Sequence, residues 1–113
     1  MDTETITLLH ERTGPDSRLL QARYAKGGDL LIEGQDLGPT VEAFWGPGNT
    51  EYEWGMAIKA TDFAVLTKAL DGDPGEDVLA LLARRFREDP DIASKSHLDA
   101  SGVPIEFWSR VGD

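Results

Sequence analysis

The stretch from Glu51 to Lys59, which reads Glu-Tyr-Glu-Trp-Gly-Met-Ala-Ile-Lys, carries the clearest fold signal in the chain. Side chains of a β-strand point alternately to opposite faces, so every second residue shares a face. One face would carry the large side chains of Tyr52, Trp54, Met56 and Ile58. The opposite face has Gly55 and Ala57 at its middle, where a second layer or a ligand could come close. We therefore predict a strand with one apolar face turned towards a core.

Three further strands are predicted before this stretch. Alternating side chains, separated by turn residues, mark them at residues 5–11, 18–25 and 30–33. The first of these strands would place Ile6, Leu8 and His10 together on one face. Gly27 and Gly28 can supply the positive φ angles of a tight hairpin between the second and the third strand.

The segment from residue 35 to residue 49 allows two interpretations. Pro39 and Gly46 suit the start and the end of a short helix over 40–45, whereas an irregular crossover fits the same residues. In both cases the run Gly46-Pro47-Gly48-Asn49 forms a loop that leads into the strand at 51–59.

The apolar spacing becomes helical after residue 59. Thr61 is the expected N-cap of a first helix, which would end near Gly72. Asp73 and Glu76 have the spacing of a capping box, so a second helix is expected to begin there and to continue to residue 88. Its apolar stripe consists of Val78, Leu79, Leu82 and Phe86.

Two more segments complete the predicted fold. A short helix is expected within 91–101, and residues 105–108 are expected to form a last strand or a tail packed over the core. All 113 residues are assigned to a single α+β domain. We predict an antiparallel sheet of four or five strands, with the two main helices of residues 61–88 packed on one face.

The composition limits the classes of partner. The chain has no cysteine, which excludes disulfides and cysteine-based sites and fits a reducing cytoplasm. With 21 acidic and 11 basic side chains the formal net charge is -10, which favours a basic protein as partner over nucleic acid or an anionic membrane. The same excess of negative charge can serve only to keep the protein soluble. Residues 1–5 lack the features of a signal peptide, so we expect a cytoplasmic location. Because the negative charge repels other anions, we expect no nucleic-acid and no membrane partner.

Two loops are superficially similar to ligand-binding motifs, and neither matches. The acidic loop 71–77 puts Gly75 at a calcium-ligand position and Glu76 where the calcium loop requires glycine. The loop Gly46-Pro47-Gly48 lacks the lysine of a phosphate loop and precedes a strand where such a motif precedes a helix. We predict no metal and no cofactor.

His10 and His97 are the two histidines, and such side chains ordinarily titrate near neutral pH. His10 is expected in the core or at a hydrogen-bonded edge, and His97 is expected to be exposed. No motif assigns a catalytic residue, and none is predicted. A small enzyme or ligand-binding domain that combines carboxylates with His10 or His97 stays open as the alternative function.

Aromatic and acidic side chains gather around residues 44–54 and 105–110. Most of the rings are expected in the core, because aromatic side chains bury large apolar areas. Tryptophan is also enriched among the anchors of protein interfaces, and exposed rings are to be sought first at Trp45 and Trp108. The predicted binding residues are Phe44, Trp45, Glu51, Glu53, Glu106 and Trp108.

Three stretches carry a resemblance to known proteins: Glu106-Phe107-Trp108-Ser109-Arg110, Ile32-Glu33-Gly34-Gln35-Asp36-Leu37-Gly38 and Tyr52-Glu53-Trp54. Through them the chain resembles a group of short acidic actinobacterial proteins of unassigned function. The resemblance implies a bacterial origin and a cytoplasmic location, and it transfers no catalytic residue. In size and charge the chain is also similar to small bacterial immunity proteins, which neutralise basic toxins by electrostatic and aromatic contacts.

The leading hypothesis is a non-enzymatic acidic module that binds a basic protein, in the manner of an immunity protein. Its basis is the excess of negative charge together with the lack of a catalytic motif in the sequence. A mimic of nucleic acid, with carboxylates spaced like phosphates along one face, is a further hypothesis.

Overall fold

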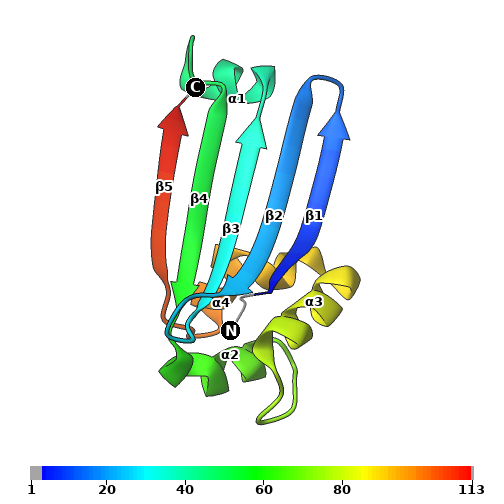
Figure 1. Cartoon of the computed structure of the whole chain (residues 1–113), viewed down its shortest axis with the longest axis vertical. Helices are drawn as coiled ribbons and strands as arrows, with labels where there is room; N and C mark the ends of the chain where they lie inside the picture. Colours follow the sequence, from blue (N-terminus) through cyan, green and yellow to red (C-terminus); the bar gives the residue numbers. More distant parts are fainter. Residues whose placement is uncertain (1–3, 113) are drawn as a thin grey trace.

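Five strands form one antiparallel sheet in the order β1-β2-β3-β4-β5, so each strand pairs with its neighbours in sequence (Figure 1). The computed structural model describes residues 4–112. The strands are β1 (Thr5–Thr13), β2 (Asp16–Tyr24), β3 (Leu30–Leu37), β4 (Glu51–Ile58) and β5 (Glu106–Gly112). The predicted α+β fold with an antiparallel sheet is confirmed, and the Glu51 stretch forms β4.

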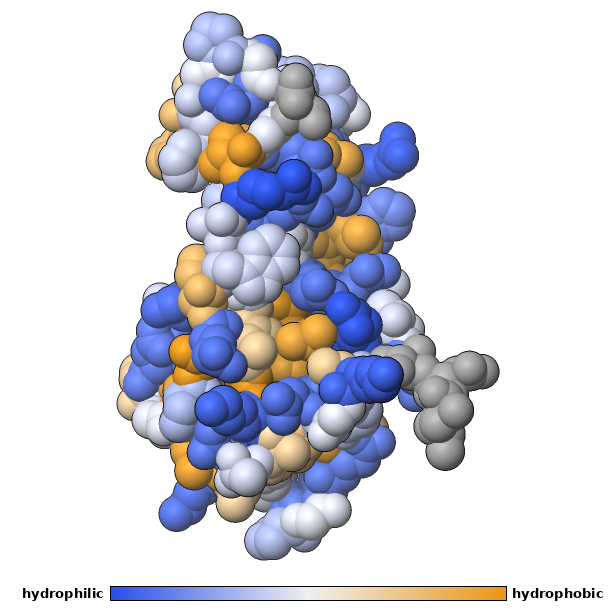
Figure 2. Space-filling model, turned by 60° about the vertical axis from the view of Figure 1, so that its left-hand side comes forward, coloured by the Kyte–Doolittle hydropathy of each residue, from blue (hydrophilic) through white to orange (hydrophobic). Residues whose placement is uncertain are grey.

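The helices lie at the two ends of this sheet. They are α1 (Pro39–Trp45), α2 (Phe63–Ala69), α3 (Val78–Glu88) and α4 (Lys95–Ala100), with 3-10 turns η1 (Ala60–Asp62) and η2 (Pro90–Ala93). In Figure 1, α2, α3 and α4 surround the end of the sheet where β4 finishes, whereas α1 lies at the opposite end. We call these regions the helical end and the α1 end. The molecule is broad at the helical end and narrower towards α1 (Figure 2).

The core lies between the helices of the helical end and one face of the sheet, which we call the core face. Residues that lie opposite each other on two antiparallel strands have their side chains on the same face. Leu30 of β3 lies opposite Ile58 of β4, and Ile32 lies opposite Met56. None of these four side chains is more than 1% exposed. Against them pack the buried residues Leu66, Leu70, Val78, Leu79, Leu81, Leu82, Phe86, Ile92, Leu98 and Val103. The alternation predicted for β4 and the packing of the main helices on one face are confirmed.

Tyr24, at the end of β2, connects the sheet to the start of α3. Its hydroxyl donates to the carboxylate of Asp77 and accepts from the Leu79 N–H at 3.2 Å. The pKa of Tyr24 is raised mainly by burial of the hydroxyl and next by its hydrogen bond to Asp77. Asp77 is also the N-cap of α3, because its carboxylate accepts from the Leu79 N–H at 3.1 Å.

The helix starts differ from the prediction. α3 begins only at Val78, whereas Asp73 and Glu76 close a turn in the preceding loop, with Glu76 Oε1 accepting from the Asp73 N–H at 3.0 Å. The predicted capping box is therefore wrong as a helix start, because the same spacing also suits this turn. Thr61 lies within η1 and is not the N-cap of α2, which is Asp62.

A β-bulge in β1 overturns the predicted alternation of the first strand. The pairing with β2 shifts between Thr7 and Leu9. Leu9 consequently packs against the core, while His10 lies opposite Leu19 on the other face and is exposed. The prediction that His10 shares a face with Ile6 is wrong, because the extra residue of a bulge reverses the alternation beyond it.

Two tryptophans cover two glycines on opposite faces of the sheet. Trp54 lies opposite Gly34 on the core face, and Trp108 lies opposite Gly55 on the other face, which we call the outer face. A Cβ atom at Gly34 would overlap the Trp54 ring, and a Cβ atom at Gly55 would overlap the Trp108 ring. Each indole thus takes the space of the missing side chain. The room predicted beside Gly55 is filled by Trp108.

Gly34→Ala is expected to destabilise the protein by about 1–3 kcal/mol, because the added methyl group overlaps the Trp54 ring and overpacks the sheet. Urea unfolding at neutral pH measures the change. Gly112→Ala is the matched control, since Gly112 also lies in a strand and a Cβ there meets nothing within 4 Å. Equal unfolding midpoints for the two variants would contradict the close packing of Trp54 on Gly34.

Tyr24→Phe is expected to lower the free energy of unfolding by about 1 kcal/mol, the typical net contribution of a hydrogen bond. Because the pKa of Tyr24 is raised on folding, the unfolded chain loses the tyrosine proton first, and stability falls as the pH rises above about 10. The part of the stability loss at alkaline pH that comes from the Tyr24 hydroxyl should vanish in Tyr24→Phe. Denaturant unfolding at several alkaline pH values tests it, with Tyr52→Phe as the control that keeps the loss. An unchanged alkaline slope in Tyr24→Phe would refute the role of this hydroxyl.

Candidate functional site

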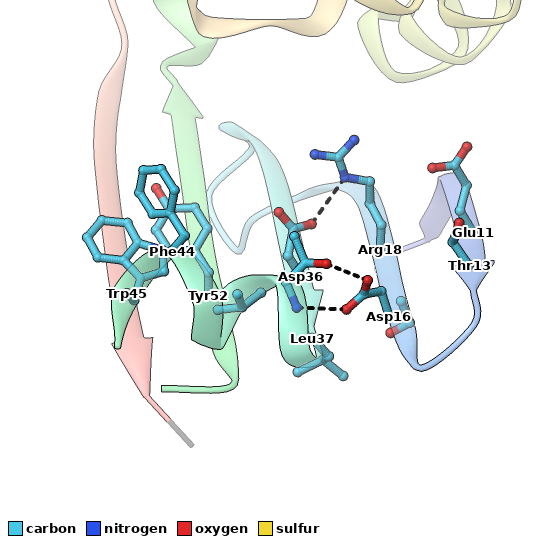
Figure 3. A pocket seen from close by; sticks show the side chains of 12 residues that line it. Glu11, Thr13, Asp16, Arg18, Asp36, Leu37, Phe44, Trp45 and Tyr52 are labelled. Carbon is cyan, nitrogen blue, oxygen red and sulfur yellow. Dashed lines mark hydrogen bonds and ion pairs between the residues drawn. The ribbon is translucent and has the colours of Figure 1, made fainter. Parts of the chain in front are cut away.

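A groove opens between α1 and the core face at the α1 end (Figure 3). Its volume is about 570 Å³. The lining residues, which we call the α1 groove, are Glu11, Thr13, Asp16, Ser17, Arg18, Asp36, Leu37, Thr40, Val41, Phe44, Trp45 and Tyr52. They come from four strands and from α1, so the groove exists only because these segments are brought together at one end of the sheet.

Asp16 fixes the start of α1. Gly38 precedes the helix with φ of 121° and has no side chain to cap it. The carboxylate of Asp16 caps the helix from β2, since Oδ1 accepts from the Thr40 N–H at 3.1 Å and Oδ2 from the Thr40 hydroxyl at 2.6 Å. The hydrogen bond from the Thr40 side chain, followed by that from its backbone, lowers the pKa of Asp16. A Cβ at Gly38 would lie 2.5 Å from Asp16 Oδ1, so the cap requires glycine there.

The end of α1 supplies an exposed aromatic wall. Val41 is the buried residue of this helix, whereas Phe44 is 79% exposed and Trp45 is 45% exposed. Trp45 stacks on Tyr52 with ring centroids 5.6 Å apart, and Phe44 meets Trp45 edge-on at 5.1 Å. The three rings lie together on one side of the groove in Figure 3. The sheet therefore supports Trp45, while Phe44 projects from the surface.

Charged side chains form the other side of the groove. Arg18 and Asp36 are opposite each other in β2 and β3, with Arg18 Nε 3.3 Å from Asp36 Oδ1. Glu11 lies opposite Arg18 on β1 and is exposed. Among residues 4–112, Glu11 has neither an ion pair nor a side-chain hydrogen bond. Together with Asp16, these residues give the lining three carboxylates and one guanidinium, which is an excess of negative charge.

The six predicted binding residues lie on two different faces of the sheet. Phe44 and Trp45 line the α1 groove. The other four share the outer face of β4 and β5: Glu51, Glu53, Glu106 and Trp108. There, Glu53 forms an ion pair with Arg110, and the Gln35 amide donates to Glu51 at 2.6 Å. The two aromatic regions do not form one continuous surface, and the role of these residues in binding stays a prediction.

Neither histidine lines the α1 groove. His97 in α4 is half-buried, and its Nε2 donates to the Ala69 carbonyl at 3.0 Å, so the predicted exposure of His97 is wrong. His10 is on the outer face, away from the carboxylates of the groove. Within residues 4–112, no group of three His, Cys, Asp or Glu side chains could hold a metal ion. The geometry offers no histidine that could assist the groove carboxylates.

Most of the polar side of the groove is not evident from the sequence alone. Asp16 falls in a predicted turn, and Arg18 and Asp36 are not singled out. One signal is readable in the sequence: Arg18 continues the apolar face of β2, and a charge on such a face marks the point where the core ends. The pairing of Arg18 with Asp36 depends on the register between strands, which the sequence alone does not provide.

Comparisons with protein-family models, with curated proteins and with solved structures found no match for this chain. In the part of the chain that the structure describes, no helix is both long and apolar enough to cross a membrane.

Asp16→Ala is expected to loosen α1 without unfolding the sheet, because the helix loses its cap while the core is untouched. Amide hydrogen exchange followed by NMR should show lower protection factors at residues 40–45. Asp29→Ala is the matched control, since Asp29 accepts from the Ala60 N–H at 2.9 Å and holds η1 at the helical end. Protection should then fall around η1 and stay unchanged in α1.

Acid should produce the same local opening in the unaltered protein. Because the pKa of Asp16 is lowered on folding, its contribution to stability is present above about pH 4 and is lost as the pH falls through the lower folded value. Protection factors at residues 40–45 should fall over this range and converge with those of Asp16→Ala. Protection that is independent of both the substitution and the pH would refute the capping role.

Proposed function

We propose that this protein is a non-enzymatic acidic module that binds a basic protein through the α1 groove. The observation that carries the proposal is the 79% exposure of Phe44, next to the stacked pair of Trp45 and Tyr52. Exposing a large ring costs apolar burial that the chain could otherwise gain. A short helix that turns an aromatic side chain outwards beside a groove is typical of a binding surface.

The chemistry of the groove suits an arginine or lysine side chain of the partner. The faces of aromatic rings attract cations, so the rings of Phe44 and Trp45 can receive the charged group and its aliphatic stem. Asp16 and Asp36 already accept hydrogen bonds from Thr40 and Arg18. Glu11 lies on β1, three strands away from Tyr52 on β4, so it is available to pair with a second cationic side chain of the partner.

The charge of the whole chain supports the same class of partner. A formal net charge of -10 repels anions and attracts basic proteins over distances larger than a contact. Such attraction mainly raises the rate of association, whereas the rings of the groove would determine how long the partner stays. This combination of long-range charge and local aromatic contact is the basis for a basic protein as ligand.

A role like that of an immunity protein belongs to this proposal. The similarity in size and charge to small bacterial immunity proteins suggests a basic toxin as the partner, and the actinobacterial resemblance suggests a bacterial, cytoplasmic protein. The alternative function, an enzyme or ligand-binding domain with His10 or His97, gains no support from the groove, because neither residue lines it.

Phe44→Ala is expected to weaken binding of a basic ligand at least tenfold, because an interface anchor typically contributes more than about 1.4 kcal/mol. The probe is a panel of short arginine-rich peptides, with glutamate-rich peptides of the same length as the negative set. Titration followed by NMR should shift the Trp45 indole N–H, and calorimetry gives the dissociation constants.

Val65→Ala provides the matched control, since Val65 is an exposed apolar residue of α2, 38% accessible and outside the groove. It should bind the peptides as tightly as the unaltered protein. The proposed function fails if no basic peptide shifts the Trp45 resonance, or if Val65→Ala weakens binding as much as Phe44→Ala.

A further inference from the structure

The outer edge of β5 is a strand edge without an intramolecular partner among the described residues. β5 pairs with β4 on one side, and Figure 1 shows no element beyond it on the other. Residues 106–110 are all exposed. The backbone N–H and C=O groups that point outwards from this edge can therefore pair with another strand.

The two edges of the sheet differ in how they are protected. β1 contains the bulge between Thr7 and Leu9 and packs against α3. β5 pairs with β4 in an unbroken register from Glu106 to Gly112, with neither a bulge nor a proline. Bulges and covering helices are two of the means that prevent pairing between sheet edges, and charged side chains such as Glu106 and Arg110 are another. Within residues 4–112, the edge of β5 has neither a bulge nor a covering helix.

The sequence of β5 is complementary to itself. Glu106, Trp108 and Arg110 share the outer face, with the acid and the base placed symmetrically about the tryptophan. If a second β5 is aligned antiparallel about Trp108, each Glu106 lies opposite an Arg110, and each Trp108 lies opposite its copy while its ring stays over Gly55 of its own chain. Opposite charges placed in this way are favourable cross-strand contacts.

The other side chains of β5 suit the same alignment. Phe107 and Ser109 share the core face, and the antiparallel alignment places Phe107 of each copy opposite Ser109 of the other. Phe107 is 43% exposed and Trp108 is 46% exposed, so both rings have apolar surface left to bury. The small side chain of Ser109 adds no bulk opposite Phe107, whose ring stacks on Trp54 of its own chain with ring centroids 6.5 Å apart.

From this symmetry we propose that a second copy of this chain is the partner of the β5 edge, and that the two sheets join through antiparallel β5 strands into one continuous sheet. A two-fold axis at Trp108 makes the contact closed, so association stops at the dimer. The net charge of -10 on each copy opposes association at low ionic strength, which makes the dimer dependent on concentration and on salt. This inference uses no residue of the α1 groove and does not rest on the proposed function.

The test is sedimentation velocity at about 0.15 M salt over a range of protein concentrations. The unaltered protein should change from monomer to dimer as its concentration rises. Glu106→Lys and Arg110→Glu should each raise the dimer dissociation constant at least tenfold, because each places like charges opposite each other twice. Mixing the two variants should restore dimers, since the introduced lysine of one chain then lies opposite the introduced glutamate of the other. The double variant Glu106→Lys, Arg110→Glu should also associate.

Controls separate these effects from net charge and from misfolding. Glu4→Lys makes the same change of charge at an exposed residue just before the opposite edge strand and outside the α1 groove, and this variant should dimerise at least as tightly as the unaltered protein. Circular dichroism establishes that each variant is folded. If Arg110→Glu does not fold because its Glu53 partner is lost, Glu106→Lys decides alone, since no ion pair of the described residues includes Glu106.

Three results would overturn the inference. The first is an unaltered protein that stays monomeric at every concentration and at higher salt. The second is a Glu106→Lys variant that dimerises as tightly as the unaltered protein, which would place the contact elsewhere. The third is a mixture of the two single variants that stays monomeric although both are folded. Phe44→Ala should leave dimerisation unchanged. A wrong assignment of the α1 groove can therefore be distinguished from a wrong assignment of the β5 edge.

Discussion

The strands of this protein are longer than the layer of helices that covers them, and the placement of the α1 groove follows from that mismatch. A strand of eight or nine residues spans roughly 30 Å. The buried pairs of β3 and β4 end at Ile32 and Met56. The next pair, Gly34 with Trp54, uses one indole ring to close the core. Beyond it the core face becomes charged, because no main helix is there to bury apolar side chains.

α1 covers part of this remaining face, and few contacts hold it there. Its cap comes from Asp16 on another strand, and its apolar anchors are Val41 and the stack of Trp45 on Tyr52. An element with little burial opens at a lower free energy than the core does. The wall of the α1 groove can therefore adjust to a partner while the buried pairs of the helical end stay intact. This separation of a rigid core from an adjustable rim suits a binding module.

The sequence predicts local periodicity well and long-range pairing poorly, and particular residues show why. The alternation of Trp54, Met56 and Ile58 follows from one strand alone, and the structure confirms it. The bulge at Thr7 and the pairing of Arg18 with Asp36 depend on a neighbouring strand, so no local pattern reveals them. The start of α3 fails for another reason, since the spacing of Asp73 and Glu76 fits a turn as well as a helix cap.

The two proposed surfaces occupy different parts of the sheet and can act together. The α1 groove is built from β1 to β4 and α1 on the core face, whereas the edge contact uses β5 and the outer-face residues on either side of Trp108. A dimer joined at β5 would carry two grooves on one rigid sheet. If a basic partner presents two cationic sites at a matching separation, the second contact becomes intramolecular and the overall affinity rises without any new side chain. The edge of the sheet would then determine how firmly the groove retains its partner.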